Sequence, residues 1–88
     1  MLTLEDCVAL GALSTEEIDV LAAHEHLPDI VACELGNYLL STPGGAMLIA
    51  DGIRAQIVAA RRHHRVAAAS RLEGLLVSFE RKHCRALR

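Results

Sequence analysis

The chain has 88 residues, of which 52% are hydrophobic, and its formal net charge is −2. A chain of this length forms one domain with a single core, so we expect residues 1–88 to fold as one unit. It contains no run of about 18 apolar residues, which a membrane span requires, and its acidic N-terminus lacks the basic region of a signal peptide. The sequence therefore predicts a cytoplasmic protein without a membrane partner.

The small net charge conceals a strong division between the two halves of the chain. Residues 1–53 contain nine acidic residues and no Lys or Arg, whereas residues 54–88 contain nine Lys or Arg and two acidic residues. The halves thus carry charges of −9 and +7. Because opposite charges attract within or between chains, we expect acidic helices of the first half to pack against basic helices of the second.

Two helix-start signals lie near the N-terminus. Thr3 can cap a short first helix, which carries acidic residues in its first turn and ends near Gly11. Ser14 and Glu17 have the spacing of a capping box and predict the start of a second helix. Ile18, Leu21 and Ala22 form the inner stripe of that helix.

Pro28 fits the first turn of a third helix, which we place over about residues 27–40. Its apolar positions recur at helical spacing and comprise Ile30, Val31, Leu35, Tyr38 and Leu39. Glu34 falls inside this stripe, and Glu25 continues the stripe of the second helix. A buried carboxylate is costly unless it is paired, protonated or bound to a metal, so both side chains require a partner.

The second half of the chain predicts one or two long helices. After Pro43, Gly44 and Gly45, an apolar stripe continues to about His64. The last segment carries an a/d pattern formed by Ala69, Leu72, Leu76, Phe79 and His83. Since no Gly or Pro separates these segments, either a turn lies within residues 63–67 or one helix runs to Ala86. The fold class is all-α, a compact bundle of four to five helices with short connections.

The three cysteines do not form a recognisable metal or disulfide motif. Their number is odd and no CxxC spacing occurs, which argues against a disulfide framework and against a zinc ribbon. We interpret Cys7 and Cys33 as small core residues. Cys84 lies among basic residues near the C-terminus, where a lowered thiol pKa requires exposure.

One group of polar residues is compatible with a metal site. Glu80 and His83 share a helical face in an ExxH spacing, as in bundles that hold two metal ions between carboxylates. The remaining candidate ligands are Glu25, Glu34, and His24 or His26. This donor set suits zinc, iron or manganese. The alternative interpretation is structural, with His83 at the helix C-terminus, Glu80 in solvent and Glu34 in a buried ion pair.

The basic run over residues 61–65 suggests weak nucleic-acid binding through Arg61, Arg62 and Arg65. Two features argue against this binding, because the acidic half would repel phosphate and no aromatic residues interleave with the run. The chain also lacks the HExxH, GxSxG, P-loop and dinucleotide-binding patterns. An enzymatic function is therefore not favoured.

The run HEHLPDIVACELGNYLL, followed by a Pro and two Gly, resembles a family of short uncharacterised bacterial proteins that are all-helical. The resemblance covers most of the chain. It implies that the corner before Pro28 and the third helix define the family, and it implies no activity.

The function that the sequence favours is that of a small interaction or structural module. Helices rich in Ala and Leu on so short a chain are expected to leave apolar area uncovered in a monomer. We therefore expect a homo-oligomer, most simply a homodimer, or a complex with another protein. Metal binding and nucleic-acid binding are the alternatives.

Overall fold

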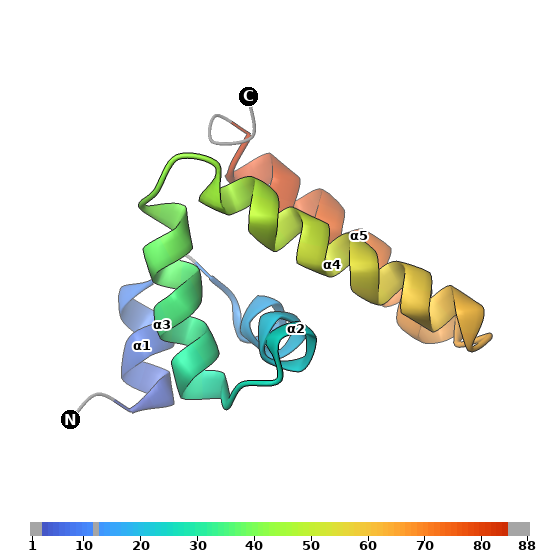
Figure 1. Ribbon diagram of the computed structural model, residues 1–88, viewed down its shortest axis with the longest axis horizontal. Helices are drawn as coiled ribbons and strands as arrows, with labels where there is room; N and C mark the ends of the chain where they lie inside the picture. The colour runs from blue at the N-terminus through green and yellow to red at the C-terminus, as the bar shows by residue number, and fades with distance from the viewer. Residues whose placement is uncertain (1–2, 12, 85–88) are drawn as a thin grey trace.

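The structure is a computed structural model, which describes residues 3–11 and 13–84. Five α-helices follow one another along the chain (Figure 1). They are α1 (Leu4–Leu10), α2 (Thr15–Glu25), α3 (Asp29–Leu40), α4 (Gly45–Arg62) and α5 (Val66–Lys82). The all-α fold expected from the sequence is confirmed.

Local signals start the first two helices as expected. The side chain of Thr3 accepts a hydrogen bond from the Asp6 backbone N–H, and Asp6 accepts one from the Thr3 N–H. Ser14 and Glu17 form the same reciprocal pair at the start of α2. Each capping box satisfies two backbone donors that the helix itself leaves free.

The turns that follow α2 and α4 each contain a residue in the left-handed backbone conformation. His26 follows α2 with φ 55°, and the Leu27 N–H donates to the Ala22 carbonyl at 2.9 Å. His64 has φ 56° between α4 and α5, and the Arg65 N–H donates to the Ala60 carbonyl at 2.8 Å. The last two helices are therefore separate, and the single continuous helix is excluded.

Helix α4 holds the fold together, because α2, α3 and α5 all pack against it, whereas α1 packs against α3. Figure 1 shows α4 and α5 side by side as a hairpin that extends past α2. Ile18, Ile49, Ile53 and Phe79 are the largest apolar side chains with almost no exposure. None of the described helices is both long and apolar enough to cross a membrane.

The buried stripe of α3 differs from the expected one. The helix buries Ala32, Cys33 and Gly36, while Val31 and Tyr38 are exposed. A Cβ atom added at Gly36 would collide with the Leu13 side chain, so the neighbouring segment approaches α3 too closely for large residues. Small size, rather than large apolar area, therefore identifies the inward face.

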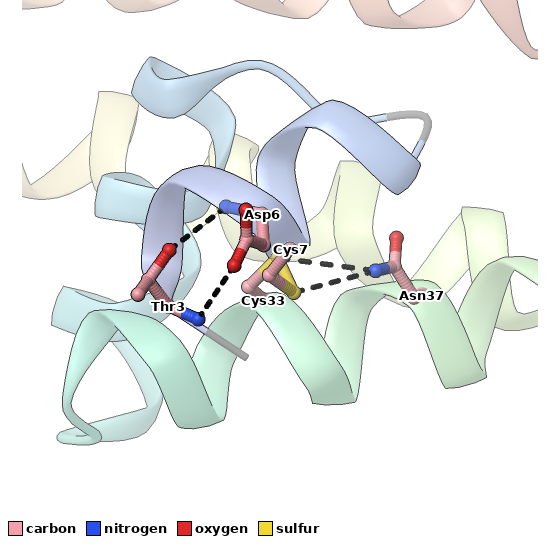
Figure 2. The surroundings of a disulfide bond; sticks show 5 residues. All are labelled: Thr3, Asp6, Cys7, Cys33 and Asn37. Atoms are coloured by element: carbon pink, nitrogen blue, oxygen red, sulfur yellow. Dashed lines mark hydrogen bonds between the residues drawn. A yellow bond between two sulfur atoms is a disulfide. The ribbon is translucent and has the colours of Figure 1, made fainter. Parts of the chain in front are cut away.

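Cys7 and Cys33 are buried as expected, but the expectation that they are unpaired is wrong. They form a disulfide that joins α1 to α3, with their Cα atoms 6.5 Å apart (Figure 2). The Asn37 side-chain amide donates to both sulfur atoms, at 3.6 Å and 3.8 Å. Packing of α1 on α3 creates this proximity, which a search for CxxC spacing cannot detect.

The two charged halves meet less extensively than their net charges suggest. Helices α2 and α3 do pack against basic α4. Among the described residues, however, one ion pair joins the acidic helices α1–α3 to the basic ones, between Glu17 and Lys82. The ion pairs that Arg54 and Arg61 form lie within the hairpin of α4 and α5. Most charges of both signs therefore face solvent.

Candidate functional site

The hairpin of α4 and α5 presents a surface that we call the outer face. On α4 its residues are Met47, Arg54, Val58 and Arg61. On α5 they are Val66, Glu73, Val77 and Glu80. Each set is spaced by seven, four and three residues, which places its members on one side of a helix. Both helices thus carry the same order of residues on this side: an apolar residue, a charged residue, a valine and a second charged residue.

Two ion pairs join the helices across the outer face. Arg54 pairs with Glu80 at 3.2 Å and with Asp51 at 3.0 Å. Arg61 pairs with Glu73. Since the hairpin is antiparallel, these pairs place Val58 and Val77 at the same height, which here means the same position along the hairpin axis. Both valines lie between the two ion pairs. The positive partners lie on α4 and the negative partners on α5.

The apolar part of the outer face lacks cover among the described residues. Of their seven large exposed apolar side chains, four belong to it, with exposures of 40% for Met47, 45% for Val58, 54% for Val77 and 77% for Val66. A hollow of about 300 Å³ lies between the two ion pairs. It is lined by α4 and α5 alone, through Arg54, Ile57, Val58, Arg61, Glu73 and Leu76. The outer face therefore points away from α1–α3.

A second hollow, of about 270 Å³, lies on the other side of the hairpin, where α2 crosses it. Its lining includes Asp19 of α2 together with Arg65 and Arg71. A hydrogen bond with Asp29, burial, and the charges of Asp29 and Glu16 raise the pKa of Asp19 above its usual 3.8. Charges of both signs line this hollow, and no buried polar side chain projects into it to select a ligand.

The residues expected to hold a metal are not gathered into one site. Glu25 and Glu34 are exposed, so the expectation that they are buried is wrong. Glu25 ends α2 where the chain turns into solvent, and Glu34 lies beside the small-residue stripe of α3 rather than within it. Within residues 3–11 and 13–84, no three His, Cys, Asp or Glu side chains are placed to share a metal ion.

The histidines and Glu80 of the same hypothesis lie apart as well. His24 Nε2 is 4.0 Å from Glu25 Oε1, both exposed at the end of α2. His26 forms the left-handed turn after that helix. Glu80 pairs with Arg54, and His83 stacks on Phe79 with ring centroids 4.6 Å apart. Apart from the contact of His24 with Glu25, these candidate ligands are not paired with one another in the described part of the chain.

The buried carboxylate is Glu17, which the sequence interpretation placed only in a capping box. Its side chain is fully buried, and Oε1 accepts hydrogen bonds from the Ser14 N–H and from Lys82 Nζ, each at 2.8 Å. Glu17 Oε2 and the buried His83 Nε2 have no hydrogen-bond partner in the described part of the chain. Glu17 precedes Leu21 by four residues, so the inner stripe of α2 already contained the signal.

His83 lies near the same carboxylate. Burial and the positive charge of Lys82 lower the pKa of His83, while the charge of Glu17 opposes them. The neutral imidazole is therefore favoured. The ion pair of Lys82 with Glu17 joins the end of α5 to α2.

The basic residues of the nucleic-acid hypothesis lie at the tip of the hairpin. Arg61 is paired with Glu73, and Arg62 and Arg65 have no ion-pair partner among the residues that the structure describes. The exposed aromatic side chain, Tyr38, is on α3, so no stacking residue accompanies the basic tip.

Comparison of the chain with family models, with curated proteins and with solved structures gives no match. The resemblance of residues 24–45 to short bacterial helical proteins stays a prediction.

Proposed function

We propose that this protein is a small interaction module that acts as a homo-oligomer and uses the outer face as its docking surface. The observation that carries the proposal is the position of Val58 and Val77, which are about half exposed between two ion pairs. A central apolar contact with a charged rim is the usual anatomy of a protein interface.

The remaining exposed apolar surface is smaller. Val31 and Tyr38, seven residues apart, share one side of α3, and Leu48 lies on α4. The outer face carries four of the seven large exposed apolar residues of the described part, two on each helix of the hairpin. It is therefore the surface that we choose as the docking site.

Light scattering and sedimentation equilibrium over a concentration series test the proposal. We expect the wild-type chain to associate reversibly. Val77→Asp should raise the dissociation constant by about 100-fold or more, because the interface would bury an unpaired carboxylate. Val31→Asp is the matched control, since Val31 is 41% exposed on α3 and should leave association unchanged. A wild-type chain that is monomeric at every concentration would contradict the proposed function.

A further inference from the structure

We propose that the outer face binds the same face of a second copy, with α4 of each copy lying on α5 of the other. This inference rests on the proposed function, because it takes the outer face as the docking surface. The product is a four-helix bundle whose two-fold axis runs parallel to the helices.

The charge pattern selects this axis. Arg54 and Arg61 give α4 a positive edge, and Glu73 and Glu80 give α5 a negative edge. A two-fold axis parallel to the helices preserves height along the hairpin, so Arg54 of one copy faces Glu80 of the other. Arg61 faces Glu73 of the second copy in the same way. Each of these four charges thus meets an opposite charge across the interface.

The other way of mating the same faces brings like charges together. A two-fold axis that crosses the helices places α4 on α4 and α5 on α5. Arg54 then lies opposite Arg61 of the second copy, and Glu73 lies opposite Glu80. Like charges that lose solvent at an interface repel strongly, so this arrangement is disfavoured.

The apolar residues fit the first arrangement equally well. Val58 and Val77 lie at one height within each chain, so the parallel axis sets Val58 of one copy on Val77 of the other. These contacts cover the hollow above Ile57 and Leu76. On α5, nothing lies within 4 Å of a Cβ built at Gly74, so the backbone of this helix is open to a close approach.

One electrostatic term opposes the arrangement. The parallel axis brings the two basic tips, each with Arg62 and Arg65, to the same end of the bundle. Both side chains are exposed, and salt screens exposed charges beyond about 8 Å at physiological ionic strength. The Arg–Glu contacts lose solvent on pairing and are screened less, so they decide the arrangement.

Exchange of the charges between the two helices tests the inference. The swapped chain carries Arg54→Glu, Arg61→Glu, Glu73→Arg and Glu80→Arg, which preserves its composition, its net charge and the two ion pairs that join α4 to α5. It loses the Arg54–Asp51 pair within α4. We expect it to dimerise with a dissociation constant within about threefold of the wild-type value, because all contacts between copies are preserved in reverse. It should not form mixed dimers with the wild type, since both helices would then meet like charges.

Native mass spectrometry of mixed samples measures the exchange, with a heavy-isotope label on one chain because the two masses are equal. Mixed dimers at or above the statistical proportion would overturn the inference, and α4-on-α4 pairing specifically predicts an excess of them. A swapped chain that folds but stays monomeric would overturn it as well. In either case a wild-type dimer would leave the proposed function intact.

Half-swapped chains keep the charge contacts between copies falsifiable if the fourfold variant does not fold, although both axes predict the same pairing of these chains. Arg54→Glu with Arg61→Glu gives a chain with two negative edges, and Glu73→Arg with Glu80→Arg gives one with two positive edges. Each alone should be monomeric under conditions in which the wild type is dimeric, and their mixture should dimerise. Failure of the mixture to dimerise would contradict the inference.

Discussion

Lys82 Nζ lies 2.8 Å from Glu17 Oε1, and this contact joins the last turn of α5 to the first turn of α2. Glu17 is fully buried, while the Lys82 side chain is 41% exposed. The ammonium group therefore neutralises a carboxylate that has little access to water. The Ser14 N–H donates to the same oxygen, so the cap of α2 and the docking of α5 depend on one atom.

Lys82→Met should lower the free energy of unfolding by about 1–3 kcal/mol, because it leaves Glu17 charged and buried without its countercharge. Combining it with Glu17→Gln should recover part of the loss. Urea denaturation of the two single variants and the double variant measures this coupling. Arg81→Met is the control, since Arg81 is exposed next to the contact and forms no ion pair with any described residue. Equal losses in Arg81→Met and Lys82→Met would refute the assignment.

His83 should make stability fall in mild acid. Its pKa is lowered in the folded state, so the unfolded chain takes up the proton first as the pH falls below 6.5. Stability should therefore be complete above that pH and decrease progressively below it. Thermal unfolding across this range should show a smaller decrease for His83→Gln than for the wild type. His64→Gln, at the exposed hairpin turn, should preserve the wild-type profile; an unchanged slope in His83→Gln would contradict the prediction.

Asp19 should have the opposite dependence. Its pKa is raised above 3.8 by Asp29 and Glu16, so the folded chain holds the proton to higher pH. This contribution is present below 3.8 and is lost as the pH rises through the folded value. Asp19→Asn should therefore stabilise the protein at neutral pH, by less than about 1 kcal/mol because solvent screens the exposed carboxylate. A gain that persisted below pH 3.8 would point to another cause.

Reduction of the disulfide should destabilise the chain. Cys7 and Cys33 are 26 residues apart, and the loop-entropy relation gives about 3–4 kcal/mol for a loop of that length. Thiol titration of the denatured, unreduced protein should find one free thiol, from Cys84, and three after reduction. Cys84→Ser should preserve the melting temperature. Three free thiols before reduction would exclude the bond and would agree with the cytoplasmic location expected from the sequence, where disulfides are rare.

Local chemistry was predictable from the sequence. The Thr3 cap and the capping box of Ser14 and Glu17 depend on residues within three positions of each other, and both are present. The outer face was also readable in principle, because the same seven, four and three spacing recurs in α4 and α5. The pattern becomes informative only when the turn at His64 sets the two helices antiparallel.

Long-range features were not predictable. Glu17 and Lys82 are 65 residues apart, and neither neighbourhood identifies the other. Glu34 was placed inside because the stripe of α3 was chosen by the size of its apolar residues. The helix instead turns Ala32, Cys33 and Gly36 inward, since its neighbours lie close. The distance between α3 and its neighbours therefore decides which of its residues are buried. This distance cannot be derived from a single sequence.

The bond between Cys7 and Cys33 also gives the N-terminal part of the chain a closed covalent topology. Residues 7–33 form a ring that contains the whole of α2. The exposed corner at Glu25 and His26 lies on this ring and offers a protease an accessible peptide bond. A single cut there opens the ring without releasing a fragment, so the nicked protein stays one molecule and separates into two pieces only when a reductant breaks the sulfur–sulfur bond.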